Sequence, residues 1–593
     1  MSPDLPLEIQ CFGKHLDNII RDENLYSALD SSPEAFDIND MLLEISAHYI
    51  DVSKFVKTYD AKNVKQLLTE MGSVGELNGR RLVIAPCSPL FDDVVQALGE
   101  HYQNVVLLDQ HRKGSKVGNL VIEDSTLFNP ADGDFCFTLT RSTQATRAYE
   151  KLFGRSNCIN ALREFSEKSL YEISPDHGHF LEIYSEAPKP VLFSSPKPLS
   201  TLSSTVRELG VAGFSPFWLG SEEVKESSQV SYSNPKLEDV AFKGHYTGGL
   251  ADQIRLFCRL PKGTILYHFE ALYPPNWDFN RVAMCYAATL AMIRTVKECR
   301  PDGIESRFAL HMYDAIKPGV KNYQAGVACG HLYQSMMREA EGIVFSSYTE
   351  EFGDFVENSV GKKLPRVHGH RYQTIPKNRR PRLTDGYHIA ILSVMLEEFW
   401  EPSRMGIVPY IREIIAQGIH IHYYASVIHH GKIQEFADSL PAEHQERFHL
   451  HLPIHDLDEL SDEISQYHAG WSLFNMQVFN DMTTYLDDQF TKDAMSLFTP
   501  TTLPSVIWSC AAAGLPVICN RAMEGVVDML PEGMTIPLTL SELGCLKNIL
   551  EEMNWEEVNK IQLDDLDISN QIYKLVAFLN GNETLTDDSY AAR

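Results

Sequence analysis

The sequence predicts an α/β protein that is built from doubly wound, parallel β-sheets. Short apolar runs typical of buried strands alternate with amphipathic runs typical of helices along most of the chain. The clearest unit is LVIAPCSPLFDDVVQALGEHYQNVVLL, which gives a buried strand, a loop, a helix and a second buried strand. Such a βαβ unit favours a parallel sheet with a right-handed crossover. The length of 593 residues suits about two to four domains.

The same alternation divides the chain into segments. A stretch rich in arginine and proline, at about 364–386, has no apolar periodicity and indicates a linker. The expected segments are a helical N-terminal extension (1–75), an N-terminal Rossmann-like lobe (76–375, with possible sub-blocks at 76–235 and 236–375), a C-terminal Rossmann-like lobe (386–560), and a terminal helix with a polar tail (561–593). Ligands of such sheets bind outside the carboxyl ends of the strands, so we expect the site in a cleft between the two lobes.

Charge narrows the range of functions. The formal net charge is -28 and the pI is about 5.2. A field of this sign repels nucleic acids and anionic lipid headgroups, so we expect no nucleic-acid partner. An anionic ligand would need a local positive site, made by helix N-termini or by a few Arg and Lys side chains.

Cysteine usage and hydropathy indicate the compartment. The 11 cysteines are scattered from Cys11 to Cys545 without a C-x-x-C pair, which fits reduced thiols better than a disulfide framework. The chain opens without a signal-peptide pattern, and no apolar run is long enough for a transmembrane segment. We therefore expect a cytoplasmic protein, in which the N-terminal extension either supports a homo-oligomer or binds the acceptor substrate.

The stretch TTLPSVIWSCAAAGLPVICN places small residues between an apolar helix and an apolar strand. Thr501 or Thr502 can cap a helix that begins near Pro504. The N-terminus of that helix presents unpaired N–H groups, which suit a diphosphate, and Ser505 adds a hydroxyl. An ordinary capped helix packed on a sheet explains the same residues. The alanines that follow and Gly514 are expected to serve close helix–sheet packing and the helix stop.

The order of IHIHYYAS, FHLHLPIHDLDELSDEISQYHAGWSLFN, LPSVIWSCAAAGLPVICN and GVVDMLPEGMTI resembles the nucleotide-sugar half of GT-B glycosyltransferases, especially those of the large retaining family 4 type. The resemblance covers about residues 386–580. It implies a hexosyltransferase that moves a sugar from a UDP- or GDP-linked donor to a glycan, lipid-linked or protein acceptor, with retention of configuration. It implies no metal ion and no cofactor other than the donor.

The resemblance also implies functional residues. On the donor side these are Thr502, Ser505, Ser509, Glu524 and Gly525. After the first strand of the C-terminal lobe, family members often place an Arg and a Lys that neutralise the leaving diphosphate. Arg404 matches the first of these, and charge stabilisation there would be its catalytic contribution.

Three side chains of the N-terminal half are candidates on the acceptor side. His311 lies in the strand RFALHMY, Asp314 follows it, and Glu270 follows the strand GTILYHF. Any of them could act as a general base, which the reaction needs only if it inverts configuration. Taken singly, each residue is better explained as a satisfied core histidine or a solvated loop carboxylate.

Two departures from the family pattern keep alternatives open. Ser509 and Thr501 occupy positions where many members carry a Glu pair that includes the ribose-binding residue, and Arg404 has no Lys after it. A catalytically inactive GT-B-fold binding or scaffold protein would tolerate these changes. A nucleotide-sugar epimerase is a further alternative, although the long N-terminal half argues against it.

Two polar features have simpler explanations. His449 and His451 point to the same side of a strand, but a metal site would need a third ligand, and we expect none. The basic stretch PKNRRPR could draw an anionic donor to the cleft or could be a solvated hinge.

Overall fold

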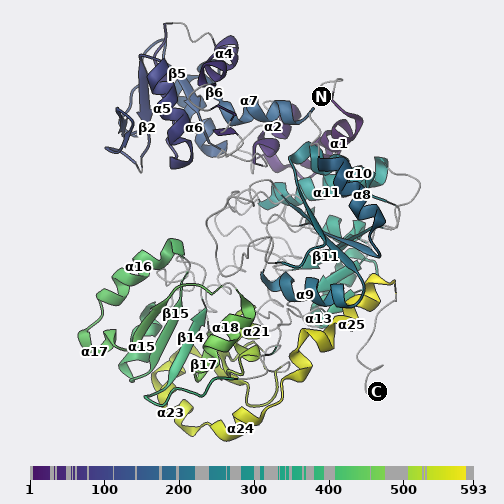
Figure 1. Cartoon of the computed structure of the whole chain (residues 1–593), viewed down its shortest axis with the longest axis vertical. Helices are drawn as coiled ribbons and strands as arrows, with labels where there is room; N and C mark the ends of the chain where they lie inside the picture. Colours follow the sequence, from purple (N-terminus) through teal and green to yellow (C-terminus); the bar gives the residue numbers. More distant parts are fainter. Residues whose placement is uncertain are drawn as a thin grey trace.

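The computed structural model describes residues 5–581 apart from 27–32, 34–35, 49–54, 57, 60–62, 76–78, 111, 141–142, 172–175, 195–199, 221–239, 262–263, 268–281, 300–307, 313–330, 333, 341, 346–349, 364–365, 369–374, 376–378, 393–407, 426, 455, 474–504, 524–526 and 528–529. Three β-sheets, each flanked by helices, are present in the described residues (Figure 1). They follow one another along the chain.

The first sheet has six strands in the order β3-β4-β2-β1-β5-β6, all parallel except β3 with β4. Helices cover both of its faces, because Leu98 of α5 and Leu162 of α7 belong to one apolar cluster and Phe153 of α6 belongs to the other. The bounds are β1 (Leu82–Ile84), η2 (Pro89–Phe91), α5 (Asp92–His101), β2 (Val105–Leu108), β3 (Lys116–Val117), β4 (Leu120–Glu123), β5 (Phe135–Thr138), α6 (Thr143–Phe153), η3 (Arg155–Asn157), β6 (Cys158–Asn160) and α7 (Ala161–Ser169), with α4 (Val64–Gly75) before them.

The second sheet has seven parallel strands in the order β13-β12-β11-β10-β7-β8-β9. Helices α1, α2, α8, α10 and α11 share one apolar cluster on one face, and α9 covers the other. The bounds are α1 (Leu7–Asp22), α2 (Ile38–His48), α8 (Asp176–Glu186), β7 (Pro190–Ser194), α9 (Ser200–Val211), β8 (Ser215–Gly220), β9 (Gly244–Thr247), α10 (Leu250–Arg259), β10 (Ile265–Tyr267), α11 (Val282–Cys299), β11 (Phe308–Met312), β12 (Gly342–Phe345), α13 (Glu350–Val360) and β13 (Arg366–His368).

The third sheet has six parallel strands in the order β16-β15-β14-β17-β18-β19. Helices α15, α16 and α23 pack on one face, and α18 and α21 pack on the other. The bounds are β14 (His388–Leu392), α15 (Val408–Ala416), β15 (His420–Tyr424), α16 (Val427–Asp438), α17 (Ala442–Gln445), β16 (Phe448–His451), α18 (Leu457–Ile464), β17 (Ala469–Ser472), α21 (Ser505–Ala512), β18 (Val517–Asn520), β19 (Thr535–Leu538), η7 (Leu540–Cys545), α23 (Leu546–Glu552), α24 (Trp555–Lys560) and η8 (Asp564–Leu566).

The second and third sheets are doubly wound. Each begins with a strand in the middle of the sheet, builds outward to one edge, returns to the middle and builds outward to the other edge. Numbered from its own first strand, each lobe follows the Rossmann order 3-2-1-4-5-6, and the second sheet adds a seventh strand. The strand order therefore reverses between β7 and β10 in one lobe and between β14 and β17 in the other. The two doubly wound lobes expected from the sequence are confirmed.

The segments differ from those expected. The N-terminal extension is not a unit of its own, because α1 and α2 pack against α10 and α11 of the second sheet. Phe55 and Leu67 pack instead on the first sheet. The expected sub-block division at residue 235 separates β8 from β9, which pair in a single sheet. The first sheet is thus inserted between two parts of the second lobe, and the apolar face of α1 is covered by that lobe.

The terminal helix α25 (Ile568–Leu579) returns to the second lobe. Leu575 and Phe578 share a core with Leu209 and Trp218, on the face of the second sheet that α9 covers. Figure 1 shows this helix, in yellow, leaving the C-terminal lobe and lying beside α9. The chain therefore passes between the two lobes twice, once through the linker and once before α25.

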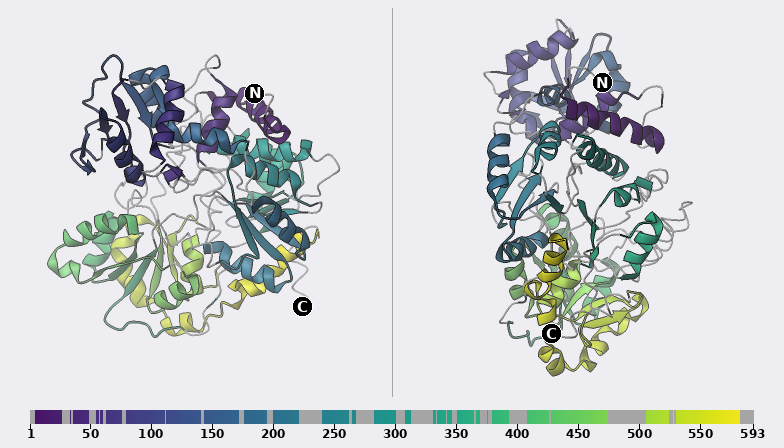
Figure 2. Two further views of the ribbon diagram at one scale, coloured as in Figure 1. Left: turned by 45° about the horizontal axis from the view of Figure 1, so that its top comes forward. Right: turned by 90° about the vertical axis from the view of Figure 1, so that its right-hand side faces the viewer.

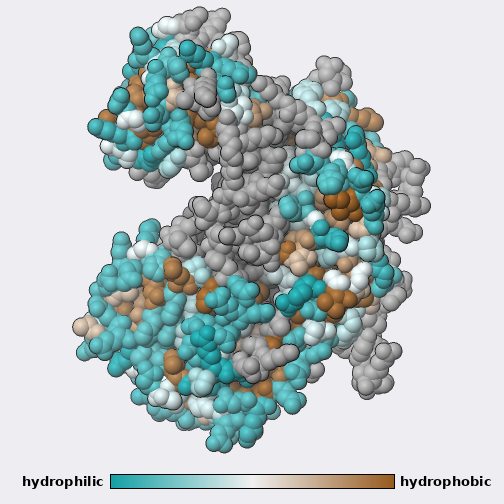
Figure 3. Space-filling view, in the orientation of Figure 1, coloured by the Kyte–Doolittle hydropathy of each residue, from teal (hydrophilic) through white to brown (hydrophobic). Residues whose placement is uncertain are grey.

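The two further views show the three sheet-containing parts as separate bodies, with the first sheet at one end of the molecule and the third sheet at the other (Figure 2). The face seen in Figure 3 is deeply hollowed between these two parts. Among the described residues, no helix is long and apolar enough to cross a membrane.

Candidate functional site

The carboxyl ends of β14 and β17 form the point where the strand order of the third sheet reverses. The two strands are neighbours, with Ile389 opposite Ala469 and Ala390 opposite Gly470. Ser472 is the last residue of β17, is 1% exposed, and has an Oγ that makes no hydrogen bond to any described residue. A buried hydroxyl without a partner costs about 1–3 kcal/mol, so it needs an explanation such as a ligand.

The second sheet repeats this arrangement. Ser194 is the last residue of β7, which pairs with β10 where the strand order reverses. Its side chain is 1% exposed, and its Oγ likewise has no partner in the described part of the chain. The sequence analysis missed both serines. In the sequence, each serine is recognisable only as the last residue of an apolar strand, Ser194 in VLFS and Ser472 in AGWS. This pattern alone is a weak indication of a binding site.

Helix α21 packs very closely on β17. A Cβ added to Gly470 would overlap the Sγ of Cys510, and Ala511 and Ala513 are buried in the same layer. The helix ends at Gly514, whose φ of +75° is the left-handed conformation expected for a helix stop. The predicted packing role of the small residues is therefore confirmed. Because only a short turn joins α21 to β18, the helix points its N-terminus back toward the carboxyl end of β17.

The predicted donor-side residues are only partly placed. Ser505 is the first residue of α21, and its side chain lies outside the described residues. Ser509 lies one turn later and is 3% exposed, in the layer between helix and sheet. Thr502, Glu524 and Gly525 lie outside the described residues.

The predicted catalytic residues lie almost wholly outside the described residues. His311 is in β11, opposite Val344 of β12, but its side chain is not described. Asp314, Glu270 and Arg404 fall in the undescribed segments that follow β11, β10 and β14 respectively. Glu270 and Arg404 thus each come after a strand at which the strand order reverses.

The basic linker is bound to the C-terminal lobe. Arg380 donates to Asp462 (2.6 Å) and Glu463 (2.5 Å) of α18. Arg382 donates to the main-chain oxygens of Tyr467 and His468, at 2.8 and 3.1 Å, and burial lowers its pKa to about 10. Among the described residues of the basic stretch, Arg380 and Arg382 are thus engaged by the C-terminal lobe before the amino end of β17.

Histidines of β14, β15 and β16 gather on one face of the third sheet, from His388 at the start of β14 to His451 at the end of β16. A chain of contacts runs from Asp385 to His388 Nε2 (2.9 Å), from His388 Nδ1 to His422 Nε2 (2.9 Å), and from His422 Nδ1 to His451 Nε2 (3.0 Å). A second contact joins His420 to His449 at 3.0 Å. His449 and His451 contact histidines of one face of β15, which confirms that the two side chains point the same way.

These histidines are held in their neutral form. Burial lowers the pKa of His422 to about 2 and that of His468 to about 4. With one proton on each ring, every Nε2–H in the chain can donate to the next acceptor and end on Asp385. His468 accepts at Nδ1 from the backbone N–H of His388 (3.1 Å). The network is satisfied internally, so we interpret it as structural.

Comparison with known proteins gives likeness at the level of structure. Neither a protein-family model nor a curated protein matches the chain. A glycosyltransferase from Rickettsia africae has a TM-score of 0.42 at 10% identity, over 67% of this chain and 100% of its own. An α,α-trehalose 6-phosphate synthase from Burkholderia multivorans has a TM-score of 0.40 at 9% identity, over 69% and 100% of the two chains.

A third similar structure is HepE of Anabaena in complex with UDP-glucose. It has a TM-score of 0.38 at 10% identity, over 66% of this chain and 94% of its own. At such TM-scores the likeness carries no argument about activity, which must rest on the residues of this chain.

Proposed function

We propose that the protein is a glycosyltransferase that moves a sugar, with retention, from a UDP- or GDP-linked donor to a glycan, lipid-linked or protein acceptor in the cytoplasm. The observation that carries the proposal is Ser472, a buried hydroxyl without a described partner at the point where the strand order of the third sheet reverses. Open doubly wound sheets bind their ligands at this point. The described cysteines are free thiols, as suits a reducing compartment.

The donor diphosphate is proposed to bind between Ser472 and the N-terminus of α21. Parallel strands β17 and β18 are joined through this helix, so its first N–H groups lie on the carboxyl side of the sheet. Unpaired N–H groups and the helix dipole favour a negative group there. Thr502 and Ser505 would add hydroxyls to the diphosphate site, while Ser509, Glu524 and Gly525 would line the sugar and ribose. Neither a metal ion nor another cofactor is proposed for this step.

The leaving diphosphate becomes more negative as its bond to the sugar breaks. A cation that meets this charge lowers the barrier more than it stabilises the bound donor. Arg404 is proposed for this role, since it comes after β14, which pairs with β17.

The acceptor is proposed to bind at the carboxyl ends of the second sheet. There Ser194 has a buried hydroxyl without a described partner at the end of β7, and Glu270 comes soon after the neighbouring strand β10. His311 and Asp314, at the end of β11, are the further candidates. A retaining reaction needs none of these as a base, so their proposed role is to orient the acceptor hydroxyl.

A second candidate function is a donor-binding protein without transferase activity. The observation that favours it is Ser509, a short and buried side chain where a ribose-binding carboxylate is expected from the resemblance. Calorimetric titration with UDP- and GDP-sugars distinguishes the candidates when it is combined with a transfer assay. Binding without transfer or donor hydrolysis would support this second function.

The test of transfer is a screen of UDP- and GDP-sugars against pooled acceptors, with products detected by their mass increase. The sharpest variant is Ser472→Ala, with Ser461→Ala as its matched control. Ser461 is also a fully buried serine whose Oγ has no described partner, but it lies on α18.

We expect Ser472→Ala to lower kcat/KM about 10-fold or more, because a hydrogen bond to a charged group contributes about 1.5–3 kcal/mol. Its thermal stability should stay equal or rise, because an unsatisfied buried hydroxyl is removed. Ser461→Ala should transfer sugar normally. Equal transfer rates in the two variants would remove Ser472 from the site.

A further inference from the structure

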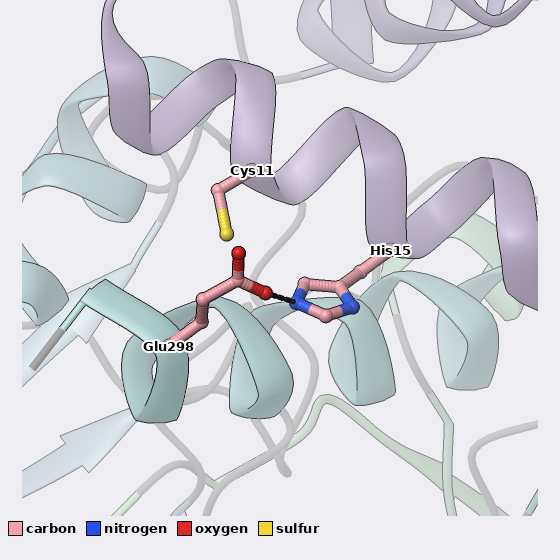
Figure 4. Close-up of side chains that lie close together, drawn as sticks. All are labelled: Cys11, His15 and Glu298. Carbon is pink, nitrogen blue, oxygen red and sulfur yellow. Dashed lines mark ion pairs between the residues drawn. The ribbon is translucent and has the colours of Figure 1, made fainter. Parts of the chain in front are cut away.

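A group of metal-binding side chains lies between α1 and α11, away from the strand ends described above. Cys11 and His15 are four residues apart on α1, so they share one face of that helix. Glu298 lies at the end of α11, and its carboxylate sits between the thiol and the imidazole (Figure 4). The Sγ of Cys11, a ring nitrogen of His15 and a carboxylate oxygen of Glu298 all lie within 4.8 Å of one another.

The imidazole of His15 faces the carboxylate of Glu298. Its Nε2 is buried and lies 2.8 Å from Oε2 of Glu298. The other carboxylate oxygen, Oε1, is 3.3 Å from Nζ of Lys14. A metal ion at this place would replace the contact between His15 and Glu298 and would be held by both side chains.

Further sulfur atoms border the same place. Cys299, the last residue of α11, lies close to Cys11 and to Cys258 on α10. All three cysteines are free thiols, and Cys11 is only 6% exposed.

We propose that Cys11, His15 and Glu298 bind a zinc ion. A thiolate, an imidazole and a carboxylate are ligand types that Zn²⁺ accepts in tetrahedral sites, in which a water molecule can be the fourth ligand. The mixture of sulfur, nitrogen and oxygen does not suit Mg²⁺ or Ca²⁺, which prefer oxygen ligands throughout. Cys11 and His15 come from one helix and Glu298 from the other, and their ligand atoms already lie close together.

The position of this site suggests a structural role. Helix α1 precedes the inserted first sheet, and α11 follows it in the second lobe. A zinc ion would therefore link α1, which comes before the inserted sheet in the chain, to α11, which comes after it. It would stabilise the folded chain because a site assembled from distant residues does not exist in the unfolded state. This role is independent of the proposed transfer reaction.

Metal content of the full chain tests the proposal. The reduced protein is incubated with Zn²⁺, freed of loose metal by gel filtration, and assayed by plasma mass spectrometry, and Co²⁺ serves as a spectroscopic probe. We expect about one zinc per chain, and a thiolate-to-cobalt charge-transfer band with Co²⁺. Zinc should raise Tm, and a chelator should reverse the rise.

Three variants locate the metal. Cys11→Ser and His15→Gln should lower zinc retention at least about 10-fold, since loss of a side chain that binds the ion costs at least as much as loss of one that only holds such a side chain in place. Glu298→Gln should leave the fold intact, because this side chain is 48% exposed. It should weaken zinc binding measurably. Cys545→Ser, which changes an exposed thiol outside the group, is the matched control and should keep its zinc.

Two results would overturn the proposal. One is a wild-type chain that retains no zinc and shows no cobalt charge-transfer band. The other is zinc retained equally by Cys11→Ser, His15→Gln, Glu298→Gln and the control. The Glu298→Gln variant keeps the test decisive if either buried substitution prevents folding, and neither result depends on whether the protein transfers sugar.

Discussion

At the residue scale, the unusual side chains are buried polar groups that the sequence gives little reason to notice. Ser472 and Ser194 are single serines at the ends of apolar strands, and such residues are common in cores. Only the strand order places them where doubly wound sheets bind ligands. The histidines were visible in the sequence as repeated pairs, but the contacts among His388, His422 and His451 depend on strand register. Local patterns carry no information about register between distant strands.

The histidine network predicts that acid destabilises the fold. The folded-state pKa of His468, about 4, lies below the ordinary value of 6.5, so between these values the unfolded state binds more protons. The free energy of unfolding should therefore fall as pH drops from 6.5 towards 4, by about 1.4 kcal/mol for each pKa unit of difference. Urea denaturation at a series of pH values from 7 to 4.5 measures this slope.

His468→Gln tests whether His468 causes this dependence of the unfolding free energy on pH. The glutamine keeps an acceptor for the backbone N–H of His388 and does not titrate. We expect its stability to depend less on pH than that of the wild type. An unchanged slope would mean that His468 is not a source of the acid sensitivity.

At the element scale, the sequence predicted strands and helices well but not their grouping. The βαβ unit at the first sheet and the order of strands in the C-terminal lobe follow from apolar runs with helices between them. The N-terminal extension was expected to stand alone, yet α1 packs on α11, which follows it by more than two hundred residues. An amphipathic pattern tells that a helix has a buried face but does not tell which partner covers it.

The close contact between α21 and β17 gives a prediction about packing. Gly470→Ala would place a Cβ against the Sγ and Cβ atoms of Cys510. The Cβ of Cys510 is attached directly to the backbone of α21, so it can move away only if the helix moves. We expect this variant to lose about 1–3 kcal/mol of stability, which is the usual cost of overpacking a core. Thermal or urea denaturation measures the loss.

Gly431→Ala is the control for this substitution. Gly431 lies within α16, and a Cβ there meets nothing within 4 Å. Its replacement should leave stability equal or slightly higher, by about 0.4–1 kcal/mol. A Gly470→Ala variant as stable as this control would mean that α21 can move away from the sheet at little cost.

At the scale of the whole molecule, two lobes are joined by chain segments that pass between them, and the first sheet is inserted into the second lobe. The linker arginines bind the C-terminal lobe, whereas α25 completes a core of the second lobe. The two-lobe architecture could be predicted, because each lobe shows its own alternation. The first sheet could not be separated from the second, because its strands show the same alternation and no linker-like stretch marks the junction.

Helix α25 should therefore stabilise the second lobe, although it follows the C-terminal lobe in the chain. Phe578 is 4% exposed and packs in the core of the second lobe. We expect Phe578→Ala to cost about 3–5 kcal/mol and to lower the calorimetric transition of that lobe. Leu452→Ala changes a side chain that is 61% exposed, and it should leave every transition unchanged. Equal melting of both variants would place α25 outside the folded core.

The central claim is that a nucleotide-sugar diphosphate binds where the strand order of the third sheet reverses. A crystal structure of the full chain with UDP at saturating concentration tests it most directly. The account predicts the diphosphate at the N-terminus of α21, within hydrogen-bond distance of the backbone N–H of Ser505 and close to the Oγ of Ser472. UDP bound elsewhere, or crystals without UDP under these conditions, would contradict the claim.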